Sequence, residues 1–267
     1  MITADKMSNA QYHATDAISS SDVKAVFGKS LAHWKHRAAF KPTIAMAIGT
    51  AVHDFCLEDG ENTVRGGADR RGNQWSDAFA EAEAHGKLLL TAGDYDLARN
   101  VADSVMFHPV GAKMAGPDTV NEASFFAKCP MTGMDIKCRP DSYDEKSGVI
   151  FDIKTCQSSA PKDVEADIRK YNYALQASWY MYVMQNAGYK ADRFCFVFVE
   201  KTAPYAVNVC ELTKEYIEWA DVMMHKALAD IKQANDTQVW DSGYSIGINA
   251  VDIPPWLAQD AASTDDF

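Results

Sequence analysis

Two acids and a lysine lie in or beside a short apolar run that is typical of an interior strand. Asp152 interrupts the run 149–153, Lys154 follows it directly, and Asp141 stands eleven residues before Asp152. Burying an unpaired charge costs on the order of several kcal/mol. These charges therefore need an ionic partner, a proton or a metal ion.

The spacing indicates what chemistry these residues could do together. Residues two apart in a strand point to the same side, so Asp152 and Lys154 share a face. A turn over the sequence DEKSG would bring Asp141 close to Asp152. Two adjacent carboxylates repel, and one takes up a proton unless a cation lies between them. Mg²⁺, with Mn²⁺ as a substitute, suits such a site, and Lys154 would then orient or deprotonate a water or stabilise charge on a phosphate.

A simpler interpretation is also open. Asp152 and Lys154 would form an ion pair at a strand edge, and Asp141 would be a turn acid after Pro140. The apolar flanks, and a Pro-Asp dipeptide separated from the strand by a turn, favour the catalytic interpretation. The pattern alone does not decide between the two.

The elements that must position these residues form a helical half followed by a mixed half. Helical spacing and capping residues predict one or two helices from Ser19 to about Phe40, then helices over about 44–57, 74–85 and 95–106. The polar segment 61–73 is expected to be an exposed loop. It carries Arg65, Arg70 and Arg71.

The second half is expected to be built around strands. Three runs, over 121–129, 133–143 and 148–155, predict a meander joined by tight turns. One helix is expected over about 161–187, followed by strands over 193–201 and 205–212 and a last helix over about 213–235. The tail from Asp236 has no core-forming pattern past Trp256. This order predicts one α/β or α+β domain.

Composition narrows the possible classes of protein. The 267 residues suit one domain, and the sequence has neither a membrane-length apolar run nor a signal-like start, so a soluble, intracellular protein is expected. Six scattered cysteines with strand-like neighbours are interpreted as reduced core residues rather than as ligands of zinc or an iron–sulfur cluster. The net charge of -11 argues against a simple basic nucleic-acid binder, although a local basic channel is still compatible with it.

Several motifs together resemble a known family. The pair Pro140-Asp141 with Asp152-Ile153-Lys154 resembles the PD-(D/E)xK nuclease signature, and further segments resemble the RecE-type exonucleases of phage and prophage recombination. The resemblance runs from about Tyr12 to Trp256. The further segments are Gly49–His53 (G-x-x-x-H), Gln176–Tyr180 (Q-x-x-x-Y), Tyr12-His13, Ile18-Ser19, Cys138-Arg139 and Pro255-Trp256.

The resemblance implies a fold and a role for each matching residue. The fold would be a central mixed sheet flanked by helices, with a helical region at about 12–110, a catalytic core at about 117–235 and a tail at about 236–267. The catalytic residues would be Asp141, Asp152, Lys154 and Glu122. The metal ligands would be His53, Asp141, Asp152, the Ile153 carbonyl and Glu122. The substrate-binding residues would be Gln176 and Tyr180, which would also brace the catalytic strand, with Ser21 and Arg37 as candidates for the 5′-phosphate beside Lys35.

Each of these roles has a structural alternative. His53 would be a core histidine, Glu122 an exposed strand acid, and Ser21 part of a helix cap. The cap is also an anion site, because free N–H groups at a helix start favour phosphate. Asp152 stands where many members of the superfamily have Glu, and Asp is permitted there.

The resemblance also implies an activity and partners. It implies a Mg²⁺-dependent exonuclease that degrades double-stranded DNA from its 5′ ends and leaves 3′ overhangs for strand annealing. It further implies a ring-shaped homo-oligomer, a RecT-type annealing partner, and the cytoplasm of a bacterium or phage-infected cell. The alternatives are an endonuclease of this superfamily and a non-catalytic DNA-binding or scaffold protein. Superfamily members with an iron–sulfur cluster need cysteines near the C-terminus, and none follows Cys210.

Overall fold

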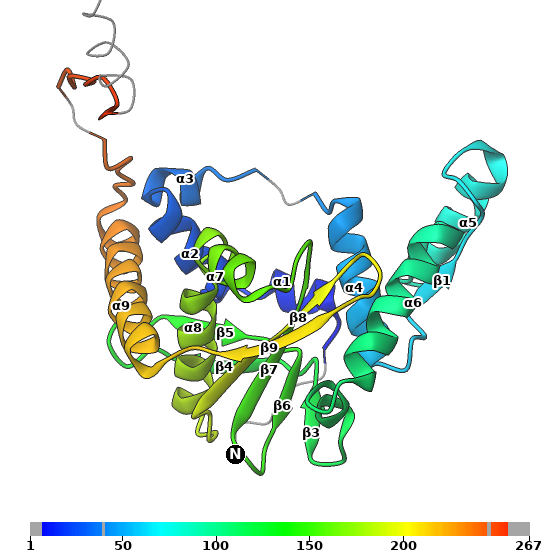
Figure 1. The fold of residues 1–267 in the computed structure, drawn as a ribbon. Helices are drawn as coiled ribbons and strands as arrows, with labels where there is room; N and C mark the ends of the chain where they lie inside the picture. The colour runs from blue at the N-terminus through cyan, green and yellow to red at the C-terminus, as the bar shows by residue number, and fades with distance from the viewer. Residues whose placement is uncertain (1–6, 39–40, 245–246, 256–267) are drawn as a thin grey trace, which may run out of the picture.

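A five-stranded mixed sheet forms the centre of the protein (Figure 1). The computed structural model describes residues 7–38, 41–244 and 247–255. β7 and β8 are parallel, and the other neighbours in the sheet are antiparallel. The fold is therefore α/β with a mixed sheet, as the family resemblance implies. Across the sheet the strands are β3 (Thr119–Asn121), β6 (Ser142–Asp144), β7 (Val149–Cys156), β8 (Arg193–Glu200) and β9 (Val207–Glu211).

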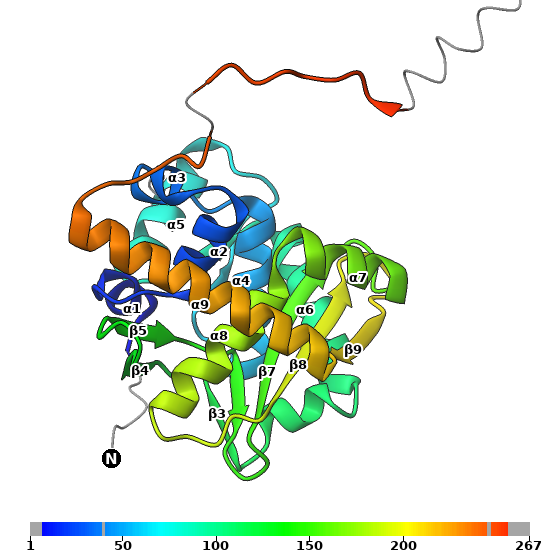
Figure 2. The ribbon, with the colours of Figure 1, turned by 90° about the vertical axis from the view of Figure 1, so that its left-hand side faces the viewer.

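Helices cover both faces of this sheet. α8 (Tyr173–Asn186) and α9 (Lys214–Thr237) cover one face, and α4 (Ile44–Leu57) and α6 (Ala92–Phe107) cover the other (Figures 1 and 2). Alternate residues of a strand point to opposite faces. Ile150 accordingly belongs to the core under α8, and its neighbour Phe151 to the core under α4 and α6. This explains why β7 is apolar on both sides.

The remaining elements lie around these layers. α2 packs against both α8 and α9, which brings the N-terminal region beside the second helix after β7. These elements are α1 (Asn9–Ala14), α2 (Ser20–Gly28), α3 (Leu31–Lys35), β1 (Thr63–Arg65), α5 (Gly72–Ala84), β2 (Leu88–Leu90), a 3₁₀ helix (Gly111–Ala115), β4 (Phe125–Lys128), β5 (Asp135–Cys138) and α7 (Pro161–Lys170).

The expected three-strand meander is wrong in its first two strands, because each is broken. The first run holds β4 and only the last residue of β3, and the two strands are separated at Glu122, whose φ of 50° is left-handed. The second divides into β5 and β6 near Pro140, which has no backbone N–H to give to a ladder. β4 and β5 form a separate hairpin. The two breaks meet, because the Glu122 N–H donates to the Asp141 carbonyl at 3.0 Å.

Two further expectations need correction. The single helix over 161–187 is two helices, α7 and α8, separated at Asn172 with φ 53° and ψ 45°. The expected loop over 61–73 contains β1, which pairs in parallel with β2. Its arginines are held by acids: Arg65 by Asp96, Arg70 by Asp94 and Arg71 by Asp69.

Two other features bear on the sequence analysis. All six cysteines are unpaired thiols, and every one except the half-buried Cys210 is buried. Within the residues that the structure describes, no helix combines the length and apolarity that a membrane crossing requires. Trp256, the last residue of the family-like motifs, lies outside the described residues.

Candidate active site

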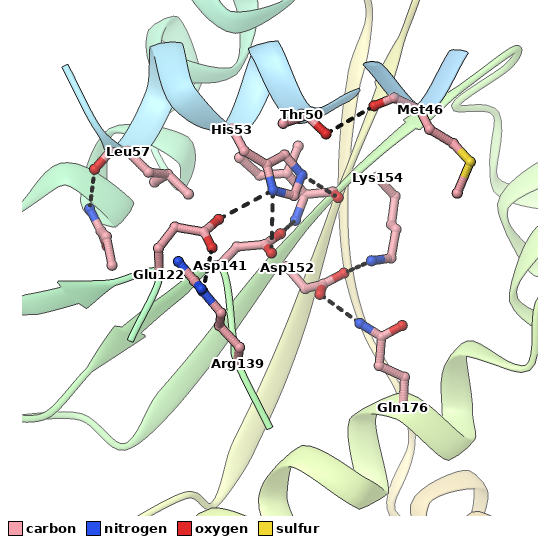
Figure 3. A network of polar contacts seen from close by, with 12 residues as sticks. Met46, Thr50, His53, Leu57, Glu122, Arg139, Asp141, Asp152, Lys154 and Gln176 are labelled. Atoms are coloured by element: carbon pink, nitrogen blue, oxygen red, sulfur yellow. Dashed lines mark hydrogen bonds and ion pairs between the residues drawn. The ribbon is translucent and has the colours of Figure 1, made fainter. Parts of the chain in front are cut away.

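β7 carries the residues at the centre of the site (Figure 3). Its register opposite β6 pairs Ser142 with Phe151, so Asp141 arrives beside the next residue, Asp152. Asp152 is 1% exposed, and the Lys154 ammonium contacts its Oδ1. The hairpin thus delivers Asp141 to β7, as the DEKSG turn predicts.

A histidine and two acids from three other segments converge on this strand. His53 Nδ1 lies 3.4 Å from Asp141 Oδ1 and 3.5 Å from Glu122 Oε1. One donor atom of each of these residues lies within 4.8 Å of the other two. α4 positions His53 because Ala51 and Val52 are fully buried in the core beneath it. The two strand breaks position the acids.

Hydrogen bonds fix the orientation of this cluster. Asp141 Oδ2 accepts from the Ile153 N–H at 2.6 Å. His53 Nε2 lies 3.3 Å from the Ile153 carbonyl, which can only accept, so Nε2 carries a proton. Glu122 Oε2 accepts from Arg139 Nε at 3.1 Å. His53 Nδ1 is left facing two carboxylate oxygens.

The electrostatics of the cluster favour an added positive charge. Burial, and then the charge of Asp152, raise the pKa of Asp141 to about 7. Burial lowers the pKa of His53, but Asp141 and Glu122 more than offset it and raise this pKa to about 9. Without a metal ion, the cluster therefore retains protons near neutral pH.

The same donor set fits a divalent cation. An unprotonated Nδ1 would direct its lone pair at two anions, so this position requires a proton or a metal ion. Two carboxylate oxygens and one imidazole nitrogen are ligands for Mg²⁺ or Mn²⁺. The cluster comprises His53, Glu122 and Asp141, whereas the oxygens of Asp152 are engaged by Lys154 and Gln176.

On its other side, Asp152 is tied to a second lysine. Gln176 Nε2 donates to Asp152 Oδ2 at 2.7 Å, and Gln176 Oε1 accepts from Lys24 Nζ at 3.1 Å. Burial, and then repulsion from Lys154, lower the pKa of Lys24 to about 8. Burial also lowers the pKa of Lys154, but Asp152 and Asp141 more than offset this and raise it. Lys154 is therefore an ammonium that can donate to a water or a phosphate oxygen.

The other candidate residues lie further from this centre. Tyr180 packs on Phe194 with ring centroids 5.9 Å apart, which suits a bracing role. Within the described part of the chain, it is not among the residues that line the cleft. Ser21 Oγ lies 2.8 Å from Ser19 Oγ at the start of α2. Arg37 forms an ion pair at 2.6 Å with the buried Asp22.

Sequence reasoning missed two contributors to the site. Lys24 was not considered because only the capped start of α2 was given a possible role, although a lysine inside VKAVF is a polar break in an apolar stretch. Arg139 stood in the motif-like phrase Cys138–Asp141 but was given no role. Its guanidinium now explains how Glu122 stays charged: burial raises the pKa of Glu122, but His53 and Arg139 lower it.

One cleft gives access both to His53 of the acidic cluster and to Lys154. The cleft has a volume of about 1320 Å³ and is lined by His53 and Lys154. Segments of α4, α5, α7 and α8 form its walls, and residues from Ile153 to Ser158 also line it. Its cationic lining includes Arg70, Lys170 and Lys201.

Comparison with known proteins identifies the family. The family model described as a PDDEXK-like domain of unknown function (DUF3799) matches residues 19–247. A "putative exonuclease" from Eubacterium rectale has a similar structure, with a TM-score of 0.63, 17% identity, and coverage of 98% of this chain and 100% of its own. A phage-related exonuclease from Haemophilus somnus 129PT gives a TM-score of 0.38 and 14% identity over 86% of this chain and 100% of its own. No curated protein matches by sequence.

Proposed function

Since the chain belongs to the PDDEXK-like domain family (DUF3799), we propose that it is a divalent-metal-dependent exonuclease of the RecE type that acts on the ends of double-stranded DNA. The supporting observation is the convergence of His53, Glu122 and Asp141 near Lys154, with His53 and Lys154 lining an open cleft. The family match and the similar exonuclease structure support the nuclease fold.

The residues divide the work of phosphodiester hydrolysis. His53, Glu122 and Asp141 would hold the ion, with the Ile153 carbonyl and Asp152 as further proposed ligands. A bound Mg²⁺ supplies an activated water and positive charge at the phosphate. Asp152 and Gln176 orient Lys154, whose ammonium donates to the phosphate oxygen that gains charge. Arg139 keeps Glu122 charged and fixed toward His53.

The finer properties in the proposal come from the RecE resemblance. They are 5′ to 3′ polarity, production of 3′ overhangs for annealing, a ring-shaped homo-oligomer, a RecT-type partner, Mn²⁺ as a substitute ion and a cytoplasmic site of action. Gln176 is retained as the helix residue that supports the catalytic strand. Ser21 and Arg37 are retained as candidate 5′-phosphate contacts because α2 packs against α8 beside the site.

One digestion tests the proposed activity. The substrates are linear DNA with one 5′-labelled end and one blocked end, and a supercoiled circle of the same sequence. We expect Mg²⁺-dependent loss of the linear strand from its 5′ end, with the circle left intact. Nicking of the circle would indicate an endonuclease, and inactivity on both substrates in Mg²⁺ and Mn²⁺ would indicate a non-catalytic protein.

A further inference from the structure

The junction between α7 and α8 places two tyrosines in contact. Tyr171 ends α7, Asn172 is left-handed, and Tyr173 begins α8. In a continuous helix, residues two apart do not face each other. The break instead brings the two rings to a centroid distance of 5.5 Å, tilted by 33°. The contact between the rings is thus a consequence of the left-handed residue.

These rings form the outer end of an aromatic stack that reaches into the core. Tyr173 lies 5.6 Å from Phe196 and 6.1 Å from Phe198, both of which are fully buried. Tyr171, in contrast, is 46% exposed and lines the cleft. The buried rings hold Tyr173 in place, and Tyr173 supports one side of Tyr171. The exposed ring is therefore supported on one side.

The stack lies directly beside the proposed catalytic lysine. Lys154 Nζ is 5.1 Å from the centroid of Tyr173, so the exposed ring is one aromatic neighbour away from it. Lys170 Nζ is 4.9 Å from the centroid of Tyr171, and Lys201 lines the same cleft. A supported aromatic face between ammonium groups suits a nucleotide, whose base stacks on the ring while its phosphate meets a lysine.

We propose that Tyr171 is a stacking platform for one nucleobase of the DNA strand in the cleft, and that Lys170 contacts an adjoining phosphate. A base inside the duplex has both faces covered by its neighbours, so at any position beyond the terminal pair the platform takes an unpaired base. The inference rests on the proposed nuclease function and deepens it. It implies that the strand enters the site with its terminal region separated from the complement.

Substitution at Tyr171 tests the platform. Stacking of one base on an aromatic side chain contributes about 1–3 kcal/mol, which is about 5- to 150-fold in affinity. We expect Tyr171→Ala to raise KM for linear DNA by a factor in this range, and Tyr171→Phe to retain most of the affinity because it keeps the ring. Tyr244→Ala removes a tyrosine that is 70% exposed outside the cleft and is the matched control.

An abasic scan separates stacking from general damage to the cleft. A tetrahydrofuran residue replaces the base at successive positions of the digested strand. At one position, wild type and Tyr171→Ala should become equal, because the base that the ring would contact is gone. A loss by Tyr171→Ala that is the same at every position would overturn the proposal, as would unchanged KM on ordinary DNA.

A binding assay distinguishes failure of the platform from failure of the nuclease. A single strand carrying 2-aminopurine is titrated with protein in EDTA, and quenching reports stacking. Quenching by wild type and not by Tyr171→Ala supports the platform even if no hydrolysis is found. Equal quenching by the two proteins, or no binding by wild type, refutes it whether or not the protein digests DNA.

Substitution of Asn172 tests whether the left-handed break between α7 and α8 is needed to position the Tyr171 ring. Glycine adopts left-handed backbone freely, whereas alanine is strained there. Asn172→Gly should keep the quenching of 2-aminopurine at saturation, and Asn172→Ala should weaken it. Equal quenching by both variants would contradict the role of the break.

Discussion

The two sides of β7 carry opposite electrostatic imbalances. On the side of α4, the carboxylates of Glu122 and Asp141 face one guanidinium, that of Arg139, and a histidine. On the side of α8, the single carboxylate of Asp152 is joined to Lys154 directly and to Lys24 through Gln176. The first side needs bound protons or another cation, and the second needs another anion. A metal ion together with a phosphate would satisfy both.

The pKa shifts on the two sides express the same difference. On the side of α4, the acid side, the pKa of Asp141 is raised to about 7 by burial and by Asp152. On the side of α8, the lysine side, the pKa of Lys24 is lowered to about 8 by burial and by Lys154. Each side therefore contains a group that a like charge disfavours. This is the arrangement expected of a site that a charged ligand completes.

The largest expected effect on DNA hydrolysis comes from removing the central charged residue of either side. Asp141→Asn and Lys154→Ala should each lower the rate of DNA hydrolysis by on the order of 10³-fold, since each removes a charge that acts at the phosphate or its ion. Single-turnover digestion in Mg²⁺ measures this. Lys128→Ala, which removes an exposed lysine of the β4–β5 hairpin, should digest normally. A near-normal rate for Lys154→Ala would refute the catalytic role of that lysine.

A smaller effect is expected at the link between Asp152 and Lys24. Gln176→Ala removes both hydrogen bonds and leaves Asp152 Oδ2 without its amide donor. Because Gln176 acts through Asp152, we expect a loss of about 10- to 100-fold in kcat, the range typical of residues that orient a ligating or catalytic group. Gln233→Ala, on the exposed face of α9, serves as control. An effect confined to thermal stability would show that Gln176 is structural.

The acid side should also reveal itself in the pH dependence of stability without metal. The pKa of His53 is raised from 6.5 to about 9 in the folded protein. Its stabilising contribution is therefore complete below pH 6.5 and is lost as the pH rises through 9. The melting temperature in EDTA should fall over this interval by about 2–4 °C for each kcal/mol lost.

Two further variants sharpen that result. His53→Asn should flatten the fall in melting temperature, because the group responsible for it is gone. Mg²⁺ should restore more stability to wild type at high pH than at pH 6.5, since the ion then competes with fewer bound protons. A melting temperature in EDTA that rises between these pH values would contradict the assignment.

The smallest effect is expected away from both sides, at the arginines of the segment 61–73. Arg65 pairs with Asp96 at 2.8 Å, and both side chains are more than half exposed. Exposed ion pairs contribute little to stability, so Arg65→Ala should leave the free energy of unfolding nearly unchanged. Because its charge is already neutralised, the salt dependence of DNA binding should stay the same. A shallower salt slope would show instead that Arg65 contacts phosphate.

Sequence reasoning predicted the regular parts of this fold and the strand at its centre. β7 and its acids follow from an apolar run and a turn, both of which are local signals. The break at Glu122 was missed because its left-handed backbone has a partner distant in sequence, and the break at Asn172 was missed because the apolar pattern runs on across it. The Glu122 N–H meets the Asp141 carbonyl, and Asn172 lies between two helices whose residues otherwise form one helical pattern.

The candidate site shows the same limit. Asp141, Asp152 and Lys154 were identified from their spacing, whereas the proposed roles of His53 and Glu122 rested on family resemblance. Lys24 is 152 positions away from its partner Gln176, and no local pattern indicates that contact. Tertiary packing, here of α2 against α8, decides which polar residues of a helix reach a site.

Divalent-ion binding is the most direct test of the opposition between the two sides. Mn²⁺ would be titrated into wild type, Asp141→Asn and Lys154→Ala, with the free ion followed by electron paramagnetic resonance. We expect wild type and Lys154→Ala to bind the ion and Asp141→Asn to lose it. Equal binding by Asp141→Asn, or no binding by wild type, would contradict the assignment of His53, Glu122 and Asp141 as the metal-binding side.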